Sequence, residues 1–232
     1  MPRVSRRGEV QVESPIRNLV PFADKAKAEG VEILHLNIGQ PDIMTPASAL
    51  QRIKHLDDTI IKYGASAGEL SLRETVSKYY NDINISIKPE QIYVTTGASE
   101  AIQFALFSCF DPGDEIIIPE PFYANYLGYS QISQVTIVPI TSDFDKQFAL
   151  PNSDKFKSLI NKNTKAIFLC NPGNPTGQLY SKPELQELVK LVKEHDLYLI
   201  VDEVYREFCY DSEFTSVLQF DEISDHVIVI DS

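Results

Sequence analysis

Short apolar runs alternate with segments of helical length along most of this chain, and that alternation limits the folds it can adopt. The predicted strands cover residues 32–36, 92–95, 115–118, 135–140, 166–170, 197–201 and 227–230. The predicted helices cover residues 15–29, 47–56, 69–81, 99–110, 123–133, 154–160 and 182–195. This order is typical of an α/β protein with a mostly parallel sheet. Because strands such as 197–201 are apolar throughout, the sheet is expected to be covered on both faces, as in a three-layer αβα domain.

The beginning of the chain is organised differently. Residues 1–45 contain few strand–helix units, and near their end they include the turn sequence Gly39-Gln-Pro-Asp42. We predict that residues 1–45 form an N-terminal arm and part of a smaller domain, and that a large domain extends over residues 46–232. Two helix starts in the large domain are marked by their sequence. Ser181 with Glu184 predicts a capping box, and Ser153 or Asp154 can cap the helix at 154–160.

Composition excludes several classes of protein. Hydrophobic residues make up 43% of the 232 residues and charged residues 23%, which is typical of a soluble globular protein. The formal charge of −12 argues against a nucleic-acid partner. The three cysteines are widely spaced and the four histidines are scattered, so neither a disulfide framework nor a metal site is expected. No signal peptide and no apolar run of membrane-spanning length is found, so no membrane association is expected and the predicted location is the cytoplasm.

The loop Cys170-Asn-Pro-Gly-Asn-Pro-Thr-Gly177 follows a predicted strand directly. Its two Asn-Pro pairs and its glycines restrict the backbone, so the loop can present the side chain of Asn174 rigidly to a ligand. Taken alone, such a loop is more commonly a tight connection between a strand and a helix. Its neighbours along the sheet decide between these interpretations.

Other predicted strands also end in residues that can bind a ligand or take part in a reaction. In a parallel sheet the carboxyl ends of the strands meet at one edge. The turn Thr96-Gly-Ala-Ser-Glu100 opens a helix, where backbone N–H groups can bind a phosphate. Tyr123 follows the strand at 115–118, Asp202 and Tyr205 follow the strand at 197–201, and Asp231-Ser232 follows the strand at 227–230. Each residue alone is more commonly a helix cap, a turn residue or a packing residue.

Together these strand ends offer a phosphate-binding turn, an aromatic ring, an amide, a carboxylate and a phenol. Neither of the glycine-rich nucleotide fingerprints, GxGxxG and GxxxxGK[ST], follows a strand. The set matches pyridoxal 5′-phosphate, which carries a phosphate, a flat ring, a phenolic oxygen and a pyridine nitrogen that must stay protonated to withdraw electrons. A carboxylate next to that nitrogen raises its pKa, which is the role that suits Asp202.

The sequence resembles a class I/II pyridoxal-phosphate aminotransferase of fold type I, close to the aspartate aminotransferase group. The matching segments are Asn37 to Asp42, Tyr63 to Arg73, Thr96 to Glu100, Asp111 to Asp114, Asn171 to Gly177 and Asp202 to Tyr205. They extend over nearly the whole chain in the order of the family. The resemblance implies a large cofactor-binding domain at residues 46–232 and an incomplete small domain.

The resemblance also implies a role for individual residues around the cofactor. Asp202 and Tyr205 are the catalytic residues that it identifies, with Asp202 at the ring nitrogen and Tyr205 at the phenolic oxygen. The full set of residues implied to bind the cofactor is Gly97, Ala98, Ser99, Tyr123, Asn174, Asp202, Tyr205, Ser232 and Tyr63.

Gly39 and Asn174 are implied to bind the substrate carboxylate. Tyr63 is implied to reach the cofactor phosphate of a neighbouring subunit, which predicts a homodimer with shared active sites. The expected small-molecule partners are an L-amino acid and a 2-oxo acid, with aspartate as the family-level expectation and aromatic amino acids, methionine and alanine as the next candidates. The resemblance does not identify the amino acid further.

One departure from the family concerns the lysine that forms a Schiff base with the cofactor. It is expected about three residues after Ser232, where this sequence stops, and the last lysine present is Lys193, in a predicted helix before the strand at 197–201. We therefore expect these residues to be the N-terminal portion of a transaminase, truncated before the catalytic lysine and inactive by themselves. Two alternatives remain open: a β-lyase or a related synthase of the same fold, and a non-catalytic regulatory or truncated module.

Overall fold

The computed structural model describes residues 2–11, 14–37, 39–55 and 59–232. The chain divides into two compact units: Met1–Val12 together with Ala67–Ser232, and Glu13–Ser66. Each unit is described by itself. This division differs from the predicted boundary after residue 45, which remains a prediction about the organisation of the domains.

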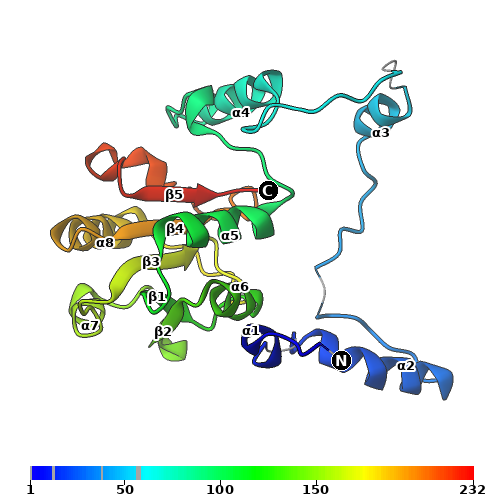
Figure 1. The fold of residues 1–232 in the computed structure, drawn as a ribbon, viewed down its shortest axis with the longest axis horizontal. Helices are drawn as coiled ribbons and strands as arrows, with labels where there is room; N and C mark the ends of the chain where they lie inside the picture. Colours follow the sequence, from blue (N-terminus) through cyan, green and yellow to red (C-terminus); the bar gives the residue numbers. More distant parts are fainter. Residues whose placement is uncertain (1, 12–13, 38, 56–58) are drawn as a thin grey trace. The chain divides into compact units, whose positions relative to one another are not determined.

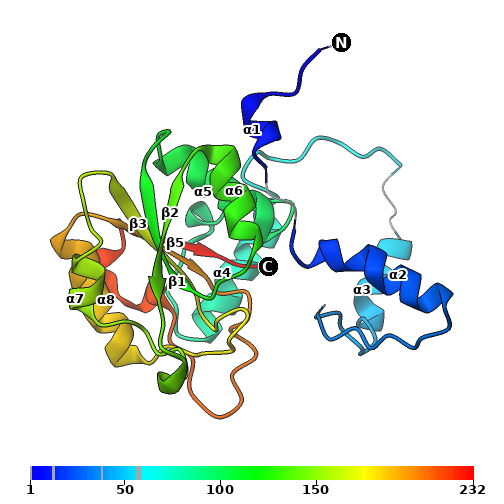
Figure 2. The same ribbon diagram turned by 90° about the horizontal axis from the view of Figure 1, so that it is seen from below.

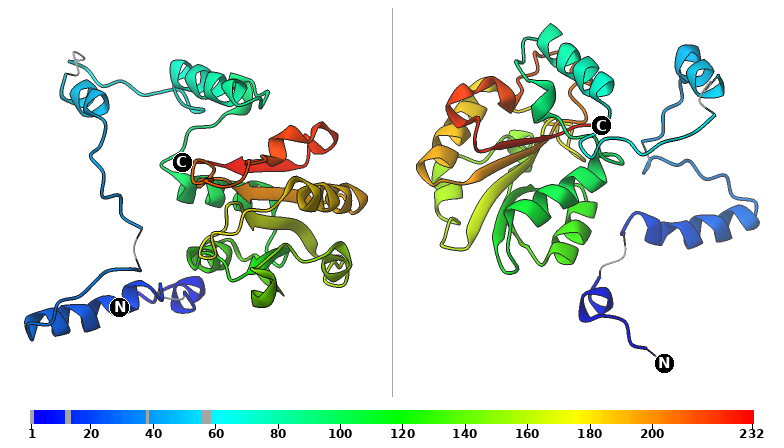
Figure 3. Two further views of the ribbon diagram at one scale, coloured as in Figure 1. Left: turned by 180° about the vertical axis from the view of Figure 1, so that it is seen from behind. Right: turned by 45° about the horizontal axis from the view of Figure 1, so that its top comes forward.

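The larger unit is built around one parallel sheet (Figures 1 and 3). Its strands are β1 (Glu115–Glu120), β2 (Thr136–Thr141), β3 (Thr164–Cys170), β4 (Tyr198–Asp202) and β5 (Val227–Ile230). Their order across the sheet is β2-β1-β3-β4-β5, and every neighbouring pair is parallel. All five were predicted from sequence to within two residues at each end.

Helices cover both faces of this sheet, as Figure 2 shows. On one face lie α5 (Ala98–Cys109) and α6 (Asn125–Ser133), and on the other lie α7 (Ser153–Lys157) and α8 (Lys182–Glu194). Successive side chains of β4 alternate between the two cores: Leu199 and Val201 pack in the α8 core, whereas Ile200 packs in the α5 core. Because both faces of the sheet are covered, side chains on either face of β4 are buried, which explains why its sequence is apolar throughout. The three-layer αβα prediction is confirmed.

The remaining elements of the larger unit lie around these layers. They are α1 (Arg6–Glu9), α4 (Leu70–Asp82) and the short 3-10 helices η2 (Pro89–Gln91), η3 (Phe144–Lys146), η4 (Val217–Gln219) and η5 (Asp221–Ile223). The backbone N–H of Ser181 donates to the Glu184 carboxylate at 2.8 Å, so the predicted capping box is present at α8. The predicted cap of α7 is wrong, because the helix begins at Ser153 and the side chain of Asn152 accepts the hydrogen bond.

The predicted strand at 92–95 is also wrong. Val94 donates one backbone hydrogen bond to Ala67, at 3.0 Å, but no described strand runs beside this segment. A strand is stabilised by a ladder of bonds to a neighbour, and a favourable local sequence does not replace that neighbour.

The smaller unit, Glu13–Ser66, contains η1 (Arg17–Leu19), α2 (Val20–Ala28) and α3 (Ala47–Lys54). The predicted helix at 15–29 is therefore split, and residue 56, where the next helix was expected to end, lies outside the described residues. The predicted strand at 32–36 is wrong: the segment has no regular structure, and Leu36 is 94% exposed. No described residue of this unit is buried, so nothing in it supplies the contacts that a strand needs.

Candidate active site

The carboxyl ends of β3, β4 and β5 open at one edge of the sheet, because the three strands are parallel and adjacent. In register, Cys170 lies beside Asp202, and Asp202 lies beside Ile230. The loop after β3 is joined to the end of β4 by a backbone hydrogen bond of 2.9 Å from the N–H of Asn171 to the carbonyl of Asp202. Such an edge is where ligands bind to open parallel sheets.

The loop after β3 is held by its own polar groups. Asn171 is fully buried, and its Oδ1 accepts a 2.9 Å hydrogen bond from the backbone N–H of Tyr180. Within the loop, the N–H of Gly173 donates to the carbonyl of Gln178 at 2.8 Å. This anchoring places the amide Nδ2 of Asn174 3.4 Å from the hydroxyl of Tyr205, to which it donates. Two residues predicted to share a site are thus brought together across 31 positions of sequence.

Asp202 is a buried carboxylate, only 5% exposed. Its Oδ2 accepts a hydrogen bond of 2.7 Å from the hydroxyl of Tyr126, and its Oδ1 accepts a weaker one of 3.3 Å from the N–H of Val204. Burial raises the pKa of Asp202 above its usual value, and the Tyr126 hydrogen bond opposes that rise. Among the residues that the structure describes, no cation pairs with this carboxylate. A positive charge placed next to it would therefore be strongly stabilised.

Tyr126 is a site residue that the sequence reasoning missed. Its ring packs at 4.6 Å from the ring of Phe168 and lies edge-on to Tyr123 at 5.4 Å. Burial raises the pKa of Tyr126 strongly, so its hydroxyl keeps the proton that it donates to Asp202. The signal was present in the sequence, because tyrosines at 123, 126 and 129 recur every three residues and therefore lie near one face of a helix.

The start of α5 has the geometry expected of a phosphate-binding turn. Gly97 precedes the helix with φ of +77°, a conformation that favours glycine, and a Cβ added there would meet no atom within 4 Å. The helix begins at Ala98, and the first N–H groups of a helix have no partner within it. The Oγ of Ser99 lies 2.6 Å from the hydroxyl of Tyr129, a second residue that the sequence reasoning missed.

Tyr123 connects this turn to the end of β4. Burial raises its pKa, and the nearby hydroxyls of Tyr129 and Tyr205 raise it further. The Nδ2 of Asn125 donates to its hydroxyl at 2.6 Å, which fixes the orientation of the phenol. Tyr123 therefore interacts electrostatically with Tyr129, which contacts Ser99, and with Tyr205, which contacts Asn174.

The structure shows fewer contacts for three of the predicted site residues, Ser232, Gly39 and Tyr63. Ser232 follows β5, is exposed, and donates its backbone N–H to Oδ1 of Asp231 at 2.8 Å. Gly39 and Tyr63 belong to the smaller unit, and Tyr63 is fully exposed. Ile38, in the motif around Gly39, lies outside the described residues. The roles of these three residues stay predictions.

The chemistry of this edge fits pyridoxal phosphate. A protonated pyridine nitrogen would supply the cation that buried Asp202 does not have, and the amide–phenol pair of Asn174 and Tyr205 can donate to a phenolate. The unhindered glycine turn before α5 leaves room for a phosphate. These properties define a pyridoxal-phosphate protein of fold type I.

Solved structures support that class. The aspartate aminotransferase from Thermotoga maritima matches with a TM-score of 0.91 and 32% identity, over 98% of this chain and 61% of that one. The alanine aminotransferase from Pyrococcus furiosus matches with a TM-score of 0.87 and 31% identity, over 99% of this chain and 59% of that one.

The chain belongs to the class I and II aminotransferases, whose family model matches residues 31–232. In sequence it is 37% identical to YugH of Bacillus subtilis (strain 168), which is named as an aminotransferase, over 94% of this chain and 56% of that protein. The chain thus spans about three fifths of the length of these relatives. Pyridoxal phosphate is the cofactor of the family, which confirms that prediction. Within the part of the chain that the structure describes, no helix has the length and apolar character needed to span a membrane.

Proposed function

We propose that the protein transfers an amino group from an L-amino acid to a 2-oxo acid, with pyridoxal phosphate bound at the carboxyl edge of the sheet. The observation that carries this proposal is the buried carboxylate of Asp202, which has a phenol but no cation as partner. When bound, the cofactor supplies a ring that withdraws electrons from the substrate Cα, provided that its nitrogen is protonated. Asp202 holds that proton in place by charge attraction.

The other site residues bind and orient. Gly97, Ala98 and Ser99 hold the phosphate, with backbone N–H groups at the start of α5 and the Ser99 hydroxyl as donors, and Ser232 adds a further contact to it. Tyr123 stacks on the ring, while Asn174 and Tyr205 donate to the phenolic oxygen. Support for this arrangement comes from the 3.4 Å contact between Asn174 and Tyr205 and from the glycine turn before α5.

Removal of the proton at the substrate Cα needs a base, and the family resemblance implies that a lysine takes this role. Lys193, the last lysine of these 232 residues, is exposed near the end of α8 and cannot take that role.

The family resemblance also supports a proposal for the substrate and the assembly of the protein. Aspartate is the expected amino donor, with Gly39 and Asn174 at its carboxylate. Tyr63, whose ring is fully exposed, is expected to reach the phosphate in a second copy of the protein, which makes the enzyme a homodimer with shared sites. The expected location is the cytoplasm.

The test is product analysis. The full-length protein, purified and mixed with pyridoxal phosphate, L-aspartate and 2-oxoglutarate, is expected to form glutamate and oxaloacetate in equal amounts and to release no ammonia. The same mixture without 2-oxoglutarate is the control, and it should give at most one turnover per site. Release of a 2-oxo acid together with ammonia would instead show a β-lyase. Binding of pyridoxal phosphate without reaction of any L-amino acid would show a non-catalytic module.

A further inference from the structure

A buried arginine, Arg206, follows Tyr205 of the proposed cofactor site in the sequence. The side chain of Arg206 is only 4% exposed, and its backbone N–H closes the turn after β4 by donating to the carbonyl of Glu203 at 3.0 Å. Its Nη2 lies 2.9 Å from Oδ2 of Asp231 and 3.9 Å from Oε2 of Glu203. Its guanidinium lies over the ring of Tyr80, 4.6 Å from the centroid.

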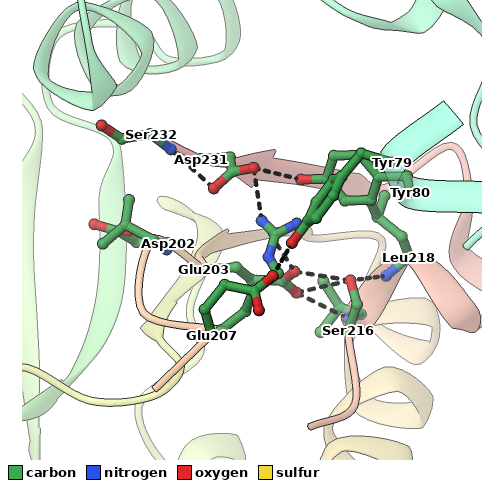
Figure 4. A network of polar contacts seen from close by, with 12 residues as sticks. Tyr79, Tyr80, Asp202, Glu203, Glu207, Ser216, Leu218, Asp231 and Ser232 are labelled. Carbon is green, nitrogen blue, oxygen red and sulfur yellow. Dashed lines mark hydrogen bonds and ion pairs between the residues drawn. The ribbon is translucent and has the colours of Figure 1, made fainter. Parts of the chain in front are cut away.

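Both carboxylates that contact Arg206 are held by other parts of the chain as well. Glu203 is fully buried and accepts hydrogen bonds from Oγ of Ser216 at 2.8 Å and from the N–H of Val217 at 3.1 Å. Asp231 accepts a 3.0 Å hydrogen bond from the hydroxyl of Tyr80, on α4. Figure 4 shows these carboxylates and Tyr80 converging from separate elements. Arg206 therefore lies at the centre of a network that joins α4, the exits of β4 and β5 and the start of η4.

The network begins where the sheet ends. The last backbone hydrogen bond between β4 and β5 runs from the N–H of Glu203 to the carbonyl of Ile230, at 2.9 Å. Beyond it, the ion pair between Arg206 and Asp231 is the side-chain contact that ties the two strand exits together, and Oδ1 of Asp231 accepts the backbone N–H of Ser232 at 2.8 Å. A continuous path of contacts thus leads from Arg206 to the backbone of Ser232.

Stability alone explains such a network poorly. Taking charges out of water costs free energy that their mutual attraction does not reliably recover, so an apolar cluster of the same volume is commonly as stable. The better-supported use of a buried ion pair is to specify one geometry.

We propose that Arg206 is a positioning residue that, through Asp231, holds Ser232 in the place from which it binds the cofactor phosphate. This inference rests on the proposed function, because it takes Ser232 and Asp202 as cofactor-binding residues. Loss of Arg206 should therefore weaken binding of the phosphate group of the cofactor. It should have little effect on binding of the ring, because Asp202 is held by Tyr126.

The experiment compares two ligands that share the pyridine ring, pyridoxine 5′-phosphate and pyridoxine, of which only the first carries the phosphate. Their dissociation constants are measured by fluorescence titration of the purified protein. In Arg206→Met, the phosphorylated ligand is expected to bind about tenfold more weakly while binding of pyridoxine changes less than twofold, because truncation of one partner leaves the other charge unpaired. Arg206→Lys keeps the cation and is expected to recover part of the loss.

Asp231→Asn removes the other end of the ion pair and carries the same comparison if Arg206→Met does not fold. The two substitutions combined are expected to cost no more than either one, because both break a single path. Lys157→Met is the matched control: it also removes one positive charge, from an exposed ion pair with Glu194, and should leave both dissociation constants unchanged.

Several outcomes overturn the inference. Equal weakening of both ligands would show a merely structural role, as would additive effects of Arg206→Met and Asp231→Asn. Unchanged binding of the phosphorylated ligand would show no role at all. A wild-type protein that binds neither ligand would instead overturn the proposed function and this inference with it.

Discussion

Asp202 and Glu203 are consecutive carboxylates at the end of β4, and the two sides of the sheet hold them in different ways. Asp202 contacts Tyr126, which packs in the core beneath α5, and no described cation pairs with it. Glu203 contacts Val217, which packs in the core beneath α8, and has Arg206 nearby. Because side chains alternate along a strand, one peptide unit separates a carboxylate suited to bind a cationic ligand from one that belongs to the scaffold.

The two carboxylates have different functions at the same strand end. Burial raises the pKa of both carboxyls, so burial alone does not distinguish them. The distinction lies in their partners: Asp202 can still accept a positive charge, whereas the oxygens of Glu203 are already occupied by Ser216 and the backbone of Val217. Three substitutions test the division.

Asp202→Asn should have the largest effect. An amide cannot keep a pyridine nitrogen protonated by charge attraction, so kcat/KM for amino transfer is expected to fall by about 10²-fold or more. The thermal unfolding temperature is measured alongside, since loss of a buried carboxylate should not destabilise the fold. Glu203→Gln is the control, and an equal loss of kcat/KM in both variants would contradict the division.

Glu203→Gln should act on stability and on its dependence on pH. Burial raises the pKa of Glu203 from its ordinary value of 4.5 to about 7. Between these two pH values the carboxyl is therefore protonated in the folded protein and ionised in the unfolded chain. Stability of the wild type must then fall as pH rises through this range. The free energy of unfolding of Glu203→Gln minus that of the wild type is expected to grow by about 1–3 kcal/mol between pH 4.5 and 7. Denaturant unfolding at both pH values measures it, and a difference that does not change with pH would rule out the pKa shift.

Tyr126→Phe should have the smallest effect. Its hydroxyl donates to Asp202 and favours the ionised carboxyl, so its removal is expected to raise the pKa of Asp202 further. The loss of one hydrogen bond to a charged group is worth about 1.5 kcal/mol at the lower end of the usual range, which lowers kcat/KM by about tenfold. The measurement is the pH dependence of kcat, which Tyr126→Phe is expected to shift. Tyr129→Phe is the control: it removes the neighbouring hydroxyl that contacts Ser99 and should leave the pH dependence of kcat unchanged. If both variants shift this pH dependence equally, Tyr126 has no separate role at Asp202.

The parts of the fold that follow from local pattern were predictable. The strands β1 to β5 and the helices α5, α6 and α8 are marked by apolar runs, by helical periodicity and by caps such as Ser181. The segments 32–36 and 92–95 have equally favourable local sequences and yet form no strand. A strand is stable only beside a second strand to which it is hydrogen-bonded, and a short segment of sequence does not show whether that second strand is present.

Local sequence predicts the five strands of the sheet and places Asn174 and Asp202 at or just after the ends of two of them, because periodicity and turn chemistry act over a few neighbouring residues. The order of the strands and the groups that hold these two residues depend on tertiary contacts. Tyr126 meets Asp202 across 76 positions, and Tyr80 meets Asp231 across 151. Contacts of that separation depend on how whole layers pack, and they determine which of two adjacent carboxylates is available to a ligand and which is fixed in the scaffold.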